Sequence, residues 1–217
     1  MTIRQLFTDA DLAAIHQATT AAERRTSGEI VAYVVGRCDG YPELGWIGAA
    51  LGALAGAGLA GAVHALGGIW GAGPLWLTVP TFGGAAVGFA LAARVAAIGR
   101  RLVPPSTLDH RARLRAEAAF LEEEVFNTRE RTGILVFVAL FEHRAMVLGD
   151  ASINAAVAPE AWQGIVDGLV DGIRAGRPAA ALQSAVEACG ALLEQHVVVR
   201  RLDDSDELSD APRIRER

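Results

Sequence analysis

Two long apolar runs dominate the pattern of hydrophobic and polar positions along the chain. Between Leu44 and Ala93 there is no Asp, Glu, Lys or Arg, and His64 is the only ionisable side chain. The runs cover roughly residues 46–70 and 75–98, and a Gly-Ala-Gly-Pro segment joins them. A helix needs about 20 mostly apolar residues to cross the ~30 Å hydrocarbon core of a bilayer, so each run is long enough. The pattern therefore predicts a transmembrane helical hairpin within residues 44–101.

Glycines recur every four residues in both runs. Small residues at this interval let two helix backbones approach closely in lipid, although a helix rich in Ala and Gly also produces such spacings by chance. We expect the glycines to form the packing face between the two helices. They are Gly48, Gly52, Gly56, Gly84 and Gly88.

The ends of the runs carry tryptophans, at positions 46, 70 and 76. Amphipathic rings of this kind favour the headgroup region of a membrane. The alternative is a hairpin buried in the core of a soluble protein. Soluble helices usually keep one charged face, and neither run has one.

Arginines flank both ends of the predicted hairpin, whereas its tip has no charge. Two spans return the chain to the side from which it started, and positive charge near span ends favours the cytoplasmic side. We therefore expect the polar parts of the chain and both termini to be cytoplasmic. The flanking residues are Arg37, Arg94, Arg100, Arg101, Arg111, Arg113 and Arg115.

Outside the hairpin, the periodicity of apolar residues predicts a small α/β domain. Runs rich in β-branched residues indicate strands that are covered on both faces, and the two later strands are so close in sequence that they must pair antiparallel. The helices are enough to cover both faces of a small mixed sheet. The expected order is a helix from Thr8, a strand over 29–35, a helix from Ser106, strands over 134–141 and 145–148, and helices from about Pro159 and Pro178.

The hairpin interrupts this domain. About 43 residues precede it, too few to bury a core alone, so residues 1–43 and 102–198 are expected to form one discontinuous domain. The fold class is then α/β, a sandwich of helices around a small mixed sheet with an inserted hairpin. Residues 199–217 are so polar that we expect a disordered tail.

Composition narrows the list of partners. The net charge is −5 and no basic run is present, which argues against a nucleic-acid partner. Cys38 and Cys189 are far apart in sequence; one disulfide is feasible in principle, and reduced thiols are the simpler interpretation. No pair of histidines has the spacing of a zinc site.

Three segments together resemble the TPM-domain family. They are residues 26–31 (Thr-Ser-Gly-Glu-Ile-Val), 126–138 (Phe-Asn-Thr-Arg-Glu-Arg-Thr-Gly-Ile-Leu-Val-Phe-Val) and 144–150 (Arg-Ala-Met-Val-Leu-Gly-Asp). The family includes thylakoid-lumen proteins linked to photosystem II repair and many bacterial membrane proteins. The resemblance implies an α/β/α sandwich, and it suggests phosphatase activity with Ca²⁺ or Mg²⁺ as cofactor. Many relatives carry a terminal anchor, so the internal hairpin is a departure.

Four polar residues are the candidates for such chemistry. Glu29 and Asp150 are candidate metal ligands, and Arg129 and Arg131 are candidates for binding a phosphate or a lipid headgroup. Each also has a purely structural interpretation: Glu29 as a solvated charge at a strand end, Asp150 as the cap of a following helix, and the arginines as partners of nearby glutamates.

These observations lead to two functional hypotheses. The first is a membrane-anchored interaction or accessory module at the cytoplasmic face, acting in membrane-protein assembly or repair. Its partners would be the lipid bilayer and a membrane protein, with a homo-oligomer as a further option. The second is a metal-dependent phosphatase of the TPM type. A channel ranks last, because no polar row lines either helix.

Overall fold

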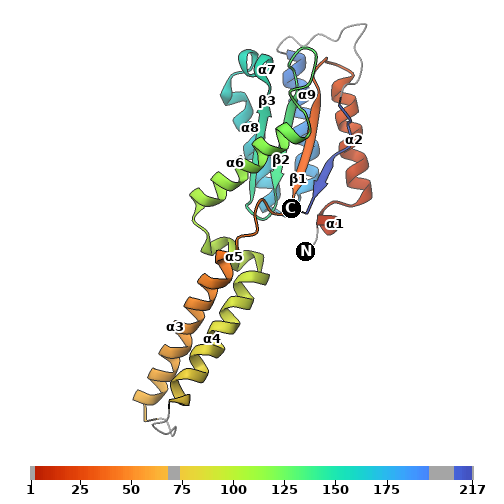
Figure 1. Ribbon diagram of the computed structural model, residues 1–217. Helices are drawn as coiled ribbons and strands as arrows, with labels where there is room; N and C mark the ends of the chain where they lie inside the picture. The colour runs from red at the N-terminus through yellow and green to blue at the C-terminus, as the bar shows by residue number, and fades with distance from the viewer. Residues whose placement is uncertain (1–2, 68–73, 196–207, 217) are drawn as a thin grey trace. The chain divides into compact units, whose positions relative to one another are not determined.

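The structure is a computed structural model that describes residues 3–67, 74–195 and 208–216 (Figure 1). The chain divides into two compact units. The α/β unit combines Met1–Asp39 with Leu108–Arg217, and the helical unit is Gly40–Thr107. The helical unit is thus an insertion within the sequence of the α/β unit.

A four-stranded mixed sheet forms the centre of the α/β unit, with strand order β3-β2-β1-β4. The central pair is parallel, with Ile30 opposite Ile134, and β3 pairs antiparallel with β2. The predicted α/β class and mixed sheet are confirmed. The strands are β1 (Ile30–Val35), β2 (Ile134–Ala139), β3 (Arg144–Gly149) and β4 (Arg213–Arg215).

Helices cover both faces of the sheet, which is why every residue of β1 and β2 is buried. Alternate residues of each strand enter separate apolar cores, as the period of two in a strand requires. Ile30 joins one core and Val31 the other. One face packs against α2 (Asp9–Glu23), α8 (Pro159–Arg174) and α9 (Pro178–Gln195), and the other packs against α6 (Pro105–Glu122) (Figure 1).

Local signals set the helix starts. Thr8 and Asp11 form a reciprocal capping box: the Thr8 hydroxyl accepts from the Asp11 amide at 3.2 Å, and the Asp11 carboxylate accepts from the Thr8 amide at 2.8 Å. This arrangement confirms the predicted start of α2. Two short helices complete the unit, α1 (Ile3–Leu6) and α7 (Ala151–Ala156).

The prediction of a disordered tail is wrong for its last part. Residues 213–215 form β4, which pairs parallel with β1, and residues 199–207 lie outside the described residues. The reason lies in the alternation Arg-Ile-Arg. Ile214 packs against the apolar core, and the two arginines on either side of it reach a carboxylate on the opposite face.

The helical unit consists of α3 (Glu43–Ala65), α4 (Leu75–Arg94) and α5 (Ala96–Leu102). The first predicted run extends to residue 70, and its last three residues lie outside the described part of the chain, as does most of the predicted joining segment. The second predicted run is interrupted. At Val95 the backbone is extended (φ −97°, ψ 99°), so α4 ends there and α5 begins.

Glycines line the contact between α3 and α4. A Cβ atom added at Gly48, Gly52 or Gly56 would lie less than 3.0 Å from backbone atoms of α4. The facing residues on α4 are Gly88, Gly84 and Pro80 respectively. Such close backbone approach is open only to residues without a side chain. The pairs run in opposite directions along the two helices, which makes the pair an antiparallel hairpin.

Separating the two helices should therefore require only one larger side chain at this contact. We expect Gly52→Leu to increase the mean distance between spin labels at positions 58 and 83 by about 2 Å and to broaden the distribution of that distance. The reason is that the distance between two helix axes depends on the side chains at their contact. Gly61→Leu is the matched control, because a side chain there meets nothing within 4 Å. Electron resonance in detergent micelles measures the distance, and identical distributions for both variants would contradict this packing.

Candidate functional site

The surface of α3 and α4 is unusually apolar. Both helices are long and apolar enough to cross a membrane, yet only 11% and 6% of their most apolar windows are buried. Trp46 and Phe82 are each 73% exposed, and Leu54 is 71% exposed. A hairpin in the core of a soluble protein would bury these side chains. The alternative of a buried soluble hairpin is therefore not what the structure describes.

Charge in the helical unit gathers at one end of the hairpin. Glu43 starts α3 and Arg94 ends α4, and the antiparallel pairing places these residues at the same end. Arg100 and Arg101 follow in α5. Partial burial and the neighbouring Arg101 lower the pKa of Arg100 from its ordinary value. The other end of the described helices carries no Asp, Glu, Lys or Arg, so the charged residues of the described hairpin lie at one end only.

Trp46 lies at the charged end of the hairpin, where its ring meets Phe89 edge-on at 5.8 Å between centroids. Trp76 is the second residue of α4, at the opposite end, and Trp70 falls outside the described residues. The two described tryptophans of the hairpin, Trp46 and Trp76, thus lie near opposite ends of its apolar surface, where interfacial tryptophans occur in membrane helices.

Asp150 has a structural role at the end of β3. Its Oδ1 accepts from the Ala151 amide at 2.6 Å, which caps α7. The Arg131 guanidinium contacts both carboxylate oxygens, with Nε 2.6 Å from Oδ2. The carboxylate is only 6% exposed, and a capped helix and an arginine already occupy it. Arg131 and Asp150 are therefore brought together, as partners of each other.

Glu29 lies at the same end of the sheet as Asp150, but β2 separates them. Ile134 pairs with Ile30 on one side and with Gly149 on the other, so the two acidic residues are two strand spacings apart, about 10 Å. Metal–oxygen distances of about 2.3–2.6 Å make direct sharing of one cation unfavourable. Within the described parts of the chain, no cluster of three His, Cys, Asp or Glu could hold a metal ion. Arg129 is exposed on the loop between α6 and β2.

Glu29 is buried (7% exposed), which differs from a solvated charge at a strand end. Its carboxylate accepts from the Leu208 amide at 3.4 Å. Nearby, Glu23 accepts from the Ile30 amide at 2.8 Å, and Thr20 donates to Asp210. Burial raises the pKa of Glu23 to about 9, and the negative charges of Glu29 and Asp210 add to the effect. Several of these contacts tie the C-terminal segment to the rest of the unit.

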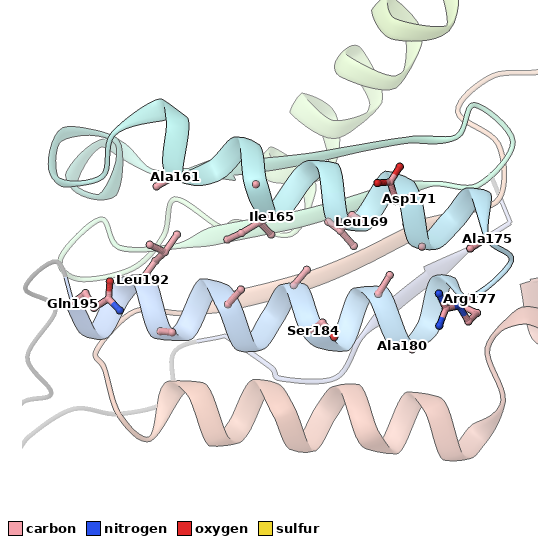
Figure 2. Close-up of a pocket in the computed structure, with 17 residues that line it drawn as sticks. Ala161, Ile165, Leu169, Asp171, Ala175, Arg177, Ala180, Ser184, Leu192 and Gln195 are labelled. Atoms are coloured by element: carbon pink, nitrogen blue, oxygen red, sulfur yellow. The ribbon is translucent and has the colours of Figure 1, made fainter.

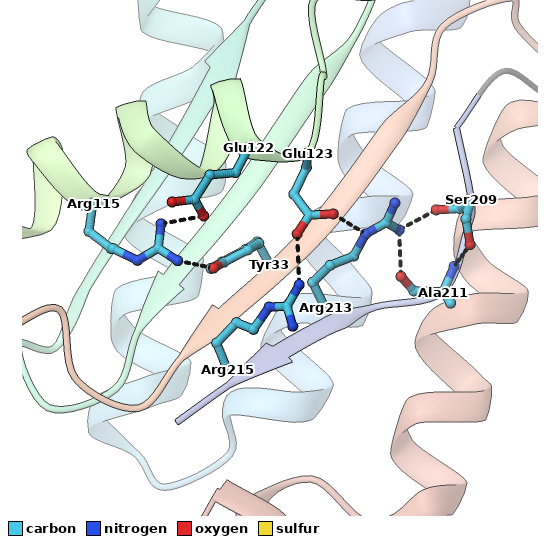
Figure 3. A network of polar contacts seen from close by, with 8 residues as sticks. All are labelled: Tyr33, Arg115, Glu122, Glu123, Ser209, Ala211, Arg213 and Arg215. Atoms are coloured by element: carbon cyan, nitrogen blue, oxygen red, sulfur yellow. Dashed lines mark hydrogen bonds and ion pairs between the residues drawn. The ribbon is translucent and has the colours of Figure 1, made fainter. Parts of the chain in front are cut away.

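A second polar network holds β4 in place (Figure 3). Glu123 lies between two arginines, with Oε2 2.9 Å from Nε of Arg213 and Oε1 3.4 Å from Arg215. Its side chain is 14% exposed. Beside it, Arg115 pairs with Glu122 at 3.1 Å and donates to the Tyr33 hydroxyl.

Sequence reasoning missed Glu123. Residues 122–124 are three successive glutamates, and nothing in this run distinguishes the middle one from its neighbours. In the structure α6 ends at Glu122, and Glu123 turns toward β4. The only signal for this was the Arg-Ile-Arg alternation in the C-terminal segment, which resembles a strand with one buried position.

A cavity of about 870 Å³ lies between α8 and α9 (Figure 2). Alanine and glycine residues form most of its wall, and the larger apolar side chains of Ile165, Leu169 and Leu192 complete it. Asp171 and Arg177 lie at one end, and Gln195 lies at the other (Figure 2). No nucleophile with an adjacent base lines the cavity, so it lacks the arrangement of a catalytic site.

Comparison with known proteins supports the fold. The chain is similar to the NMR structure of the BA42 protein from the psychrophilic bacterium Bizionia argentinensis, with a TM-score of 0.58. The alignment covers 96% of this chain and 94% of that chain at 17% sequence identity, and BA42 is a TPM-like domain protein. At this identity the similarity concerns the fold alone. No family model and no curated protein matches the chain.

The structural role of Asp150 predicts graded losses of stability. Asp150→Ala removes the cap and the ion pair and should lower the free energy of unfolding by about 2 kcal/mol. Asp150→Ser retains a capping oxygen and should lower it by about 1 kcal/mol. Chemical denaturation of the full chain in detergent measures both. Equal stability of Asp150→Ala and the wild-type chain would contradict the assignment.

The raised pKa of Glu23 predicts a dependence of stability on pH. The folded state holds this proton more tightly than the unfolded state, whose pKa is near 4.5. Its contribution is therefore complete below pH 4.5 and is lost as the pH rises toward about 9. Glu23→Gln keeps the acceptor for the Ile30 amide and removes the titration. We expect a smaller fall in melting temperature between pH 5 and pH 9 than in the wild-type chain, and an unchanged fall would contradict the assignment.

Proposed function

We propose that this protein is a membrane-anchored interaction module. The α3–α4 hairpin crosses the bilayer twice, and the α/β unit engages a membrane protein at the cytoplasmic face. The observation that carries the proposal is the exposed apolar surface of α3 and α4. Each Å² of apolar surface that is removed from water stabilises the buried state by about 25 cal/mol. Transfer of this exposed apolar surface into lipid is therefore strongly favourable.

The arrangement of charge supports the orientation. All four charged residues between positions 43 and 101 lie at the end of the hairpin where the chain enters and leaves it: Glu43, Arg94, Arg100 and Arg101. Three of them are arginines, and arginine near span ends favours the cytoplasmic side. The uncharged tip then crosses to the opposite side at little electrostatic cost.

The proposal of an interaction module follows from the α/β unit. On its described surface one sheet edge is closed by a short strand, and addition of a strand to a sheet edge is a mode of protein recognition. The residues expected to serve a metal-dependent phosphatase have other partners, since Asp150 caps a helix and pairs with Arg131. We therefore do not propose phosphatase activity.

Arginine substitutions on the hairpin test the membrane assignment. Each arginine at the centre of a span opposes insertion by about 2.5–3.5 kcal/mol. We expect the double variant Leu54→Arg/Phe82→Arg to leave the membrane pellet after alkaline carbonate extraction, whereas the wild-type chain is released only by detergent. The matched control is Leu114→Arg/Leu121→Arg, which alters leucines that are also exposed (52% and 64%) but lie on α6.

The outcome that would contradict the proposal is a wild-type chain that carbonate releases. Orientation is tested separately with a C-terminal tag. Protease should remove the tag in inverted vesicles and spare it in intact spheroplasts. The reverse pattern would contradict the cytoplasmic placement.

A further inference from the structure

The edge of β1 that faces away from β2 pairs with β4, which is only three residues long. We propose that this edge is an acceptor site for an extended Arg-apolar-Arg segment of a partner protein, and that the chain's own C-terminal strand occupies it in this structure. Addition of a strand to a sheet edge is a general mode of peptide recognition. The bound C-terminal strand shows how such a ligand is held.

The backbone of β1 fixes the direction and register of the ligand. Tyr33, Val34 and Val35 pair in parallel with residues 213–215, and the Gly36 amide donates to the Arg215 carbonyl at 2.9 Å. A Cβ atom at Gly36 would lie 2.8 Å from the Glu216 carbonyl oxygen. The absence of a side chain at this position therefore lets an incoming strand approach the end of β1.

Side chains supply the selectivity. Successive residues of a strand point to opposite faces, so the two arginines lie together and the residue between them points the other way. Glu123 receives both arginines, and Ile214 packs against the core beneath the sheet. One nearly buried carboxylate with two guanidinium partners favours a ligand with two basic residues separated by one apolar residue.

The contacts of β4 are weak enough for another strand to replace it at the edge of β1. The β1–β2 pair has six residues a side, all buried, whereas β4 offers three residues that are partly or fully exposed. Arg215 is 56% exposed, so its ion pair with Glu123 is open to water and is screened by salt. Short strands with exposed hydrogen bonds open at lower free energy than the core of a sheet. The edge can therefore change occupant while β1, β2 and β3 stay intact.

This inference names the recognition surface of the proposed interaction module, and so rests on that proposal for its biological setting. Its test is independent of the membrane, because it uses the full chain in detergent and a soluble peptide. Failure of peptide binding thus leaves the membrane result unaffected, and failure of insertion leaves the peptide result unaffected.

The probe is a fluorescent peptide with the sequence of residues 208–217. Its protein partner is Arg213→Gln/Arg215→Gln, in which the resident strand is weakened. We expect the peptide to bind this variant at least about tenfold more tightly than the wild-type chain, whose own strand competes at high effective concentration. On the same background, Glu123→Gln should weaken binding by about tenfold or more, as should replacing the two peptide arginines that correspond to Arg213 and Arg215 by glutamine.

Glu122→Gln is the matched control, since Glu122 pairs with Arg115 and not with β4. It should leave peptide affinity unchanged. No binding to the weakened variant, or equal binding to the Glu123→Gln protein, would overturn the proposal. Light scattering that shows a dimer of the wild-type chain, lost in Arg213→Gln/Arg215→Gln, would overturn it too, because the natural occupant would then be a second copy.

Hydrogen exchange of the wild-type chain tests the same idea without a variant. The Gly36 amide bonds to β4, and the Leu140 amide bonds to the Val35 carbonyl at 3.0 Å between the two central strands. We expect the Gly36 amide to exchange at least about tenfold faster, and the difference to grow with salt. Equal protection of the two amides would show that β4 does not leave, which would overturn the proposal.

Discussion

The parallel pairing of β1 with β2 is the constraint on which the rest of the structure depends. Parallel strands need a crossover connection, and α6 supplies it here, against the face that carries Val31, Tyr33 and Val35. The hairpin is inserted between β1 and that crossover helix. The connection that it extends runs from the end of β1 to α6, and both of these elements pack in the same apolar core. A helical insertion can thus occupy the middle of a domain's sequence without interrupting its core.

The hairpin has two faces with different physical properties. Where Gly52 faces Gly84, the missing side chains allow close backbone packing of α3 against α4. On the outer surface, leucine, phenylalanine and tryptophan remain exposed, and it is this surface on which the proposed membrane insertion rests. The inner face therefore specifies the packing of the hairpin, and the outer face carries the proposal about its surroundings. Both consequences follow from where the small residues lie on the helices.

The amino-acid sequence was sufficient to predict an element of structure wherever the pattern of residues was long or strictly periodic. The strands at 30–35 and 134–139 and the capping box at Thr8 were predictable because each depends on neighbours in sequence. The cap that Asp150 forms on α7 was predictable from its neighbours in sequence, whereas its ion pair with Arg131 and the role of Glu123 were not, since Arg131 and β4 come from other segments. Three residues of β4 are too few for periodicity to show, and a polar segment gains structure only from the sheet edge that it meets.

Removal of the insertion tests most directly whether the β1–β2 pair closes the domain independently of the hairpin. Residues 40–103 are replaced by a short Gly/Ser linker that leaves α6 in place as the crossover. We predict a protein that is soluble without detergent, unfolds cooperatively, and retains the β1–β2 contacts between Ile30 and Ile134 in its NMR spectra. A protein that aggregates, or that lacks these contacts, would contradict the claim that the strand pair closes the domain independently of the hairpin.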